Sequence, residues 1–297
     1  MKYVLAMFIA CLLAGKAFGN EVITPHFRFT SDSGSRGTME RVVAIAEKKR
    51  QEIFDFLDCH NEERIEVHIV SDLHSEEMQR RPEWVAGYAI PNERRIVLFA
   101  YGDEVFHAED IFTHELAHIA LHMVLGGKEI PTWFNEGLAM LFADKDLISR
   151  LETLMKAQAL GGLIPLDDLD QAFRAGAPRV HLAYSEAMFF VRFLAKELGS
   201  HRLRELLSLV KDGTPFATAL FQVTNTPLHG LFERFSKTLD RKKAVLWVVL
   251  GSPFLWAGIT VLSIVAVVVK RRKTRLKKKT WEIQEELDKI QKERYLS

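Results

Sequence analysis

The sequence contains little cysteine, and this scarcity already excludes several classes of protein. Two cysteines in 297 residues are too few for a disulfide scaffold or a cysteine-rich zinc module. The 9 prolines and 17 glycines exclude collagen-like and linker-dominated chains. No internal repeat and no usable Asn-x-Ser/Thr glycosylation sequon is present. Because 48% of the residues are hydrophobic and 27% are charged, a globular core is expected.

The formal net charge of +1 is an average over two oppositely charged parts. Residues 20–240 contain 24 Lys and Arg against 34 Asp and Glu, a formal charge of −10. Residues 270–297 contain 11 basic and 5 acidic residues, a formal charge of +6. The acidic main part argues against nucleic acid as a partner, and the basic end suits an anionic membrane surface.

The N-terminus has the pattern of a secretory signal peptide over residues 1–19. Lys2 gives it a positive start, an apolar run follows, and the small residues Ala17 and Gly19 stand at the cleavage-determining positions. An uncleaved N-terminal anchor is one alternative. A lipoprotein cleavage site before Cys11 is another, although only ten residues precede it.

A second apolar run predicts a membrane anchor near the C-terminus. Residues 244–269 contain no charge over 26 positions, which is long enough to cross a bilayer, and a transmembrane helix is expected over 241–269. Residues 270–279 include eight Lys or Arg, so the positive-inside rule places the tail 270–297 in the cytoplasm. Residues 20–240 would then be exported, in the periplasm or outside the cell, on a single-pass protein of the cell (inner) membrane. A buried core helix is the alternative interpretation of the run.

The exported part predicts an α+β domain, because strand patterns come first and helical patterns follow. Strands are expected at 26–30 and 65–70, with an edge segment and a strand within 87–99. Helices are expected at 39–57, 103–126, 132–144, 148–159, 166–175, 181–198, 201–211, 215–222 and 227–240. A small sheet with an edge strand would therefore precede a mostly helical second half.

The helical pattern of residues 103–126 contains the motif HELAH, an HExxH sequence. On a helix, His114 and His118 lie on one face, so both imidazoles can bind one ion. Glu115 lies beside the first histidine, where a carboxylate can take a proton from a water activated by zinc. The motif alone also occurs by chance, and a zinc site needs a third protein ligand.

The segment PTWFNEGLA supplies a candidate for that third ligand. Pro131 suits the start of a helix, and Glu136 then falls within its first two turns. An antiparallel second helix would present Glu136 to the two histidines, and the small Gly137 and Ala139 would let these two helices approach closely. Two histidines, one glutamate and a water form a known catalytic zinc arrangement, with one ion per chain.

HELAH followed 18 residues later by the glutamate of WFNEGLA resembles the gluzincins, the zinc metallopeptidases that include thermolysin and the aminopeptidase-N group. Together with WVAGYAIPNERRIVLF upstream and YSEAMFFVRFL downstream, it is most similar to small bacterial "peptidase MA-like" domains. The resemblance implies zinc on His114, His118 and Glu136, with Glu115 as general base and acid. Family members often have a carboxylate four residues after the third ligand, where this chain has Met140.

The resemblance also implies an oxyanion donor from the downstream helices and a strand that binds substrate. Tyr184 is the candidate donor, with His181 one turn before it, and a merely packed Tyr184 is the alternative. Residues 87–99 would pair an extended peptide along the sheet edge. His122 extends the histidine series, but three residues at this spacing spread too far along a helix to share one ion.

The sequence thus predicts a membrane-anchored zinc metallopeptidase that acts on a peptide or protein substrate outside the cytoplasm. The aminopeptidase signature for a substrate N-terminus is not found, which favours an endopeptidase. A catalytically silent zinc-binding adaptor of the same fold is the main alternative, and the intact Glu115 argues against it. An anchored helical adaptor with a chance HExxH is the third hypothesis, and it predicts no stoichiometric zinc.

Overall fold

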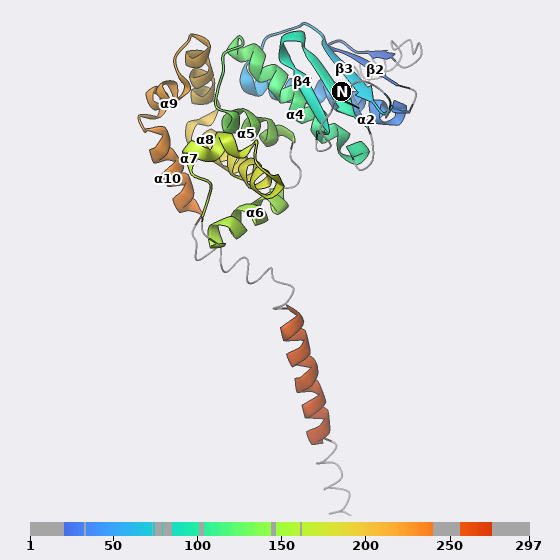
Figure 1. Cartoon of the computed structure of the whole chain (residues 1–297), viewed down its shortest axis with the longest axis vertical. Helices are drawn as coiled ribbons and strands as arrows, with labels where there is room; N and C mark the ends of the chain where they lie inside the picture. Colours follow the sequence, from blue (N-terminus) through green and yellow to red (C-terminus); the bar gives the residue numbers. More distant parts are fainter. Residues whose placement is uncertain are drawn as a thin grey trace, which may run out of the picture. The chain divides into compact units, whose positions relative to one another are not determined.

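A computed structural model describes residues 21–32, 34–72, 74, 79, 85–100, 104–143, 147–160, 162–239 and 256–274 (Figure 1). Contacts divide the chain into two units, Met1–Asp240 and Arg241–Ser297. In the second unit, residues 256–274 are helical. The first unit contains a small sheet followed by a helical half, which confirms the predicted α+β class.

Within the described residues, the sheet has five strands in the order β1-β2-β3-β5-β4. The three central strands, β2 (Phe27–Ser31), β3 (Ile65–Val70) and β5 (Arg95–Phe99), run parallel to one another. The edge strands β1 (Glu21–Ile23) and β4 (Gly87–Ile90) pair antiparallel with β2 and β5. The 3₁₀ turn η1 (Pro91–Glu93) connects β4 to β5. The predicted edge segment and strand within 87–99 are therefore confirmed, whereas β1 was not predicted.

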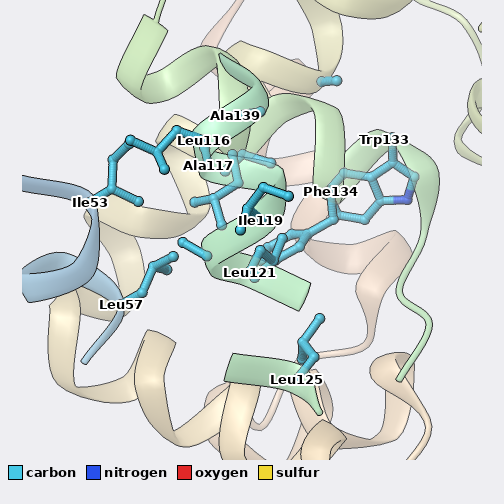
Figure 2. Close-up of a cluster of buried hydrophobic side chains, with 14 of the residues drawn as sticks. Ile53, Leu57, Leu116, Ala117, Ile119, Leu121, Leu125, Trp133, Phe134 and Ala139 are labelled. Carbon is cyan, nitrogen blue, oxygen red and sulfur yellow. The ribbon is translucent and has the colours of Figure 1, made fainter. Parts of the chain in front are cut away.

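Two helices, α2 (Arg36–Leu57) and α4 (Glu104–Leu125), contact the strands and one another. Alternate strand residues such as Phe29, Val67 and Leu98 are buried in the same core as these helices, as the period of a β-strand requires. Figure 2 shows part of this core, where Ile53 and Leu57 of α2 lie among side chains that include Leu116 and Ile119 of α4. The HExxH helix is thus held by apolar contacts on its inner side.

The other alternate residues of the same strands are mostly polar. Arg28, Glu66 and Arg95 stand opposite one another across β2, β3 and β5, and Thr30 and His68 form the next row. These five side chains line a shallow hollow of about 300 Å³ together with Tyr88, Val67 and Val97. One face of the sheet is therefore apolar, whereas the other combines these charged and polar side chains with a small buried cluster of Val70, Val97 and Phe99.

The helical half begins with α5 (Thr132–Ala143) and continues through α6 (Leu147–Leu160) and α7 (Leu166–Ala172). It ends with α8 (Ala177–Lys211), α9 (Phe216–Thr224) and α10 (Leu228–Thr238). Two helices were predicted where α8 runs, and the predicted break falls at Gly199, whose φ of 71° interrupts the helical backbone. α5 packs against both α4 and α8, so it lies at the centre of the helical half.

The predicted targeting and anchoring segments fall largely outside the described residues. The signal peptide 1–19, residues 241–255 of the transmembrane prediction and residues 275–297 of the basic tail all lie outside them. Within the described ranges, no helix combines the length and the apolar character needed to cross a membrane. Both segments therefore stay predictions from sequence.

Candidate metal centre

The site is built on the middle of α4, where the HExxH motif lies. Phe112, Leu116 and Ile119 are fully buried and hold this helix in the core. His114 and His118, four residues apart, are presented on one face. Their rings meet edge to face with centroids 4.7 Å apart, and their Nε2 atoms lie 3.1 Å from each other. The spacing of the motif thus brings two imidazole nitrogens to one point, as predicted.

The third member of the site, Glu136, comes from α5. Its carboxylate oxygens lie 3.3 Å from His114 Nε2 and 3.8 Å from His118 Nε2. One ligand atom from each of the three residues lies within 4.8 Å of the other two. Among the described residues, this is the one group of His, Cys, Asp or Glu with the arrangement of a metal site. Two helices that are separate in sequence therefore converge here.

Asn135 orients one of the histidines, a role that the sequence did not reveal. Its side-chain Oδ1 lies 2.8 Å from His118 Nδ1. An amide oxygen can only accept, so this bond places the proton on Nδ1 and leaves the Nε2 lone pair directed at Glu136 and His114. The signal that could have identified Asn135 is a polar side chain directly before the candidate ligand Glu136. Met140, four residues after Glu136, is 3% exposed and buried in the core.

Glu115 lies in a nearly closed environment beside the cluster. It is 8% exposed, and burial raises the pKa of its carboxyl group to about 7. The negative charge of Glu136 raises this pKa further, whereas His118 and a backbone hydrogen bond with Ala89 of the edge strand β4 lower it. A carboxyl group that titrates near neutral pH suits a group that takes and returns a proton.

Glu136 shows the opposite balance of effects, although it is also partly buried. Burial raises the pKa of its carboxyl group, but the hydrogen bond with His114 and the electrostatic effects of His118 and His114 outweigh burial. The pKa of Glu136 therefore lies below its usual value. Within one site, Glu136 is held ionised, as a ligand must be, while Glu115 is kept near its titration point.

Tyr184 of α8 lies close enough to the cluster to be affected by both carboxylates. Burial raises the pKa of its phenol, and the charges of Glu136 and Glu115 raise it further, so the hydroxyl stays protonated. Its ring packs edge to face on Phe173, and the Arg150 guanidinium lies 5.9 Å from the ring centroid. Tyr184 is therefore held as a hydrogen-bond donor beside the site.

The structure corrects the expectation for Gly137. It was expected to let the HExxH helix and the next helix approach closely, but it faces α8 instead. A Cβ atom at this position would lie 2.4 Å from the Ala187 carbonyl oxygen and 2.7 Å from Val191 Cγ2. Gly137 is therefore needed where α5 crosses α8, and this close contact fixes the backbone directly after Glu136.

Two other histidines lie outside the group. The His122 ring lies against the turn at Gly127, and the group of three possible ligands does not include it. The His181 side chain is exposed, and its carbonyl accepts a bond from Ser185. We therefore retain Tyr184 alone as the candidate oxyanion donor.

The sequence model of the Peptidase MA superfamily matches residues 61–240, a range that includes α4, α5 and every member of the site. The chain belongs to the Peptidase MA superfamily. A comparison with curated proteins gives no match. The superfamily match agrees with the resemblance to small peptidase MA-like domains, and together with the three converging ligand atoms it indicates a zinc-metallopeptidase-like fold.

The donor set of this Peptidase MA domain fits zinc. Two imidazole nitrogens and one ionised carboxylate oxygen are the ligands of catalytic zinc sites, in which a fourth position stays open for water. His118 has the required tautomer through Asn135, and Glu136 has the required charge state. Second partners that fix ligand orientation in this way are typical of zinc sites.

Proposed function

We propose that the protein is a zinc metallopeptidase that hydrolyses peptide bonds, with His114, His118 and Glu136 as the metal ligands. The observation that supports this most directly is the convergence of their three ligand atoms within 4.8 Å, beside a carboxyl group whose pKa is about 7. An HExxH segment present by chance would need neither a third ligand from another helix nor Asn135 behind His118.

The residues of the site divide the chemistry of peptide hydrolysis among themselves. When bound, zinc would supply Lewis-acid polarisation and lower the pKa of a water molecule to about 7. Glu115 takes the proton of the attacking water and passes it to the leaving amine, because its carboxyl group can hold or release a proton near neutral pH. The Tyr184 hydroxyl donates a hydrogen bond to the developing oxyanion.

The edge strand β4 gives a route for an extended substrate. It is the last strand of the sheet, and it pairs only with β5 among the described strands. Ala89 of this strand hydrogen-bonds Glu115, so a peptide that extends the sheet along β4 would pass the catalytic carboxylate. Such backbone recognition requires no free chain end, and we therefore propose an endopeptidase.

The proposed location rests on the sequence. The signal pattern of residues 1–19, the uncharged run 244–269 and the eight basic residues in 270–279 support an exported domain tethered to the membrane, with the tail in the cytoplasm. A protease-accessibility assay on spheroplasts, in which the outer face of the inner membrane is open to added protease, tests this topology. Digestion of the 20–240 part from outside is expected, and protection of that part would contradict the proposal.

The decisive experiment measures zinc stoichiometry in the purified protein and in Glu136→Ala and Glu115→Gln. We expect one zinc per chain in the wild type and in Glu115→Gln, and strongly reduced zinc in Glu136→Ala. A peptide library then tests turnover, which Glu115→Gln should abolish. Zinc without turnover under all conditions would favour the adaptor of the same fold, and no zinc in the wild type would overturn the metallopeptidase.

A further inference from the structure

The start of α5 lacks a cap from its own segment. Pro131 precedes the helix and has no side-chain acceptor, although its carbonyl receives bonds from the N–H groups of Phe134 and Asn135. The Trp133 N–H donates instead to Asp170 Oδ1, 2.8 Å away on α7. A residue 37 positions along the chain therefore supplies the cap that the local sequence does not.

The first two turns of α5 also carry its contribution to the metal centre. Asn135, which orients His118, and Glu136, which approaches His114 and His118, lie two and three residues after Trp133. Trp133 is 3% exposed, and its ring packs at a tilt against Phe190 of α8 with the ring centroids 4.9 Å apart. Phe190 of α8 thus holds the Trp133 ring, and Asp170 of α7 holds the Trp133 N–H. Because both partners lie outside α5, they orient the three residues that follow Trp133.

Helix α7 is itself held at its other end by a buried carboxyl group. Glu186 of α8 is 0% exposed, and both of its oxygens lie 3.0 Å from the N–H of Ile164, two residues before α7 begins. Glu186 thus joins α8 to the start of α7, and Asp170 joins α7 to the start of α5. Together with the close crossing at Gly137, these contacts define the position of Glu136 relative to α8.

We propose that Asp170 is a positioning residue for the metal centre, which acts through the Trp133 amide to hold Asn135 and Glu136 in register with the two histidines. The inference rests on the proposed zinc function. A cap that only stabilised α5 would change the melting temperature of the protein but leave the coordination of a bound ion unchanged. A positioning role changes the coordination in molecules that are still folded.

The test compares Asp170→Ala with Asp170→Asn and Asp168→Ala in the full chain. Asn keeps an acceptor for the Trp133 amide, and Asp168 is a matched control because it lies on α7 but is exposed and pairs with Arg179 at 3.9 Å. Zinc affinity is measured by chelator competition, coordination by the visible spectrum of the Co²⁺-substituted protein, and folding by circular dichroism. In chelator-treated protein, ¹⁵N NMR reports the Nδ1 proton of His118.

We expect Asp170→Ala to fold, to bind zinc about tenfold more weakly and to show an altered Co²⁺ spectrum, since loss of indirect ligand support typically costs about 10- to 100-fold in affinity. Asp170→Asn and Asp168→Ala should remain within about twofold of the wild type. A folded Asp170→Ala with wild-type affinity and spectrum overturns the proposal, as does an equal loss in Asp168→Ala.

Two further outcomes are also decisive. If Asp170→Ala does not fold, Asp170→Glu replaces it, because Glu keeps the charge but moves the acceptor by one methylene. Wild-type zinc affinity in Asp170→Glu overturns the proposal, and weaker zinc binding supports it. If the wild type binds no zinc, the proposed function fails by itself. The His118 Nδ1 signal then decides, since its loss in Asp170→Ala supports the positioning role and its persistence overturns it.

Discussion

The His26 cluster and the His114 cluster are built from the same residue types but are arranged differently. In the His26 cluster, Nδ1 lies 2.7 Å from a Glu47 oxygen and Nε2 lies 3.1 Å from a Glu62 oxygen. Both ring nitrogens thus have a carboxylate partner, so no lone pair is directed at a shared point. This cluster connects the start of β2 to α2, and Glu62 is 85% exposed.

In the His114 cluster, two rings share one carboxylate, and the outer nitrogen of His118 bonds a neutral amide. The side chains of His114, His118 and Glu136 are 21%, 13% and 18% exposed, so water screens their charges less than in the His26 cluster. The difference is that Asn135 engages only the outer nitrogen of His118 and leaves its inner nitrogen free to bind an ion, whereas carboxylates engage both nitrogens of His26.

The largest expected effect is a loss of kcat when the glutamate beside the His114 cluster is replaced, but not when a glutamate of the His26 cluster is replaced. Glu115→Gln removes the proton acceptor beside the His114 cluster but keeps the ligands, so kcat should fall about 10²- to 10⁴-fold while zinc remains bound. Glu47→Gln makes the same chemical change in the His26 cluster and should leave kcat unchanged. Peptide-cleavage kinetics with zinc analysis measure both, and a comparable loss in Glu47→Gln would break the distinction between the clusters.

The next effect concerns the residue that approaches the His114 cluster from α8. Tyr184→Phe removes one oxyanion donor and keeps the ring on Phe173, so kcat should fall about 100-fold with little change in KM. Ser185→Ala removes a neighbouring hydroxyl on α8 that bonds the His181 carbonyl, so it is the control and should keep the wild-type kcat. An unchanged kcat in Tyr184→Phe would show that its hydroxyl serves only packing.

Most of the fold around these clusters could be predicted from hydrophobic periodicity. β3 matches its predicted bounds, and α4, α5 and the break at Gly199 lie within a few residues of prediction, because each buries one regular face. The three-residue strand β1 could not be predicted, since a pattern this short has no measurable period and its pairing with β2 is a tertiary effect.

The candidate ligands could be predicted because helix geometry fixes the spacing of His114 and His118, and the WFNEGLA segment identified Glu136. The supporting residues could not be predicted. Asn135 and Asp170 act through hydrogen bonds whose partners lie 17 and 37 residues away, and no local period records such a distance. The partner of Gly137 was predicted wrongly for the same reason, since a small residue shows that a contact is close but not which helix makes it.

A smaller effect tests the uncharged partner that distinguishes the two clusters. Asn135→Ala removes the acceptor for His118 Nδ1, which should weaken zinc binding about 10- to 100-fold. Glu62→Ala removes one partner of His26 and should not change zinc affinity. Chelator competition measures both variants. Equal zinc affinity in Asn135→Ala and the wild type would mean that the amide does not set the tautomer.

The smallest effect concerns stability and compares Glu47 with the buried Glu186. Burial raises the pKa of Glu47, but hydrogen bonds from Thr24 and His26 outweigh it and the net pKa is lowered. Burial raises the pKa of Glu186 to about 8, and the Ile164 hydrogen bond offsets this only partly. Glu47 therefore stabilises the fold above its unfolded pKa, near 4.5, and this stability is lost as pH falls through its folded pKa. The contribution of Glu186 is full below pH 4.5 and is lost as pH rises through about 8.

Melting curves of the chelator-treated protein between pH 4 and pH 8.5 should show these opposite signs. Glu186→Gln keeps an acceptor for Ile164 but cannot ionise, so its melting temperature should rise relative to the wild type as pH increases, by several degrees at pH 8.5. Glu47→Gln should be less stable than the wild type at pH 7, and the gap should narrow toward pH 4. If Glu186→Gln tracked the wild type across the range, the buried carboxyl group would have to be ionised in the folded protein at little cost. The Ile164 amide would then be a stronger partner than two contacts of 3.0 Å imply.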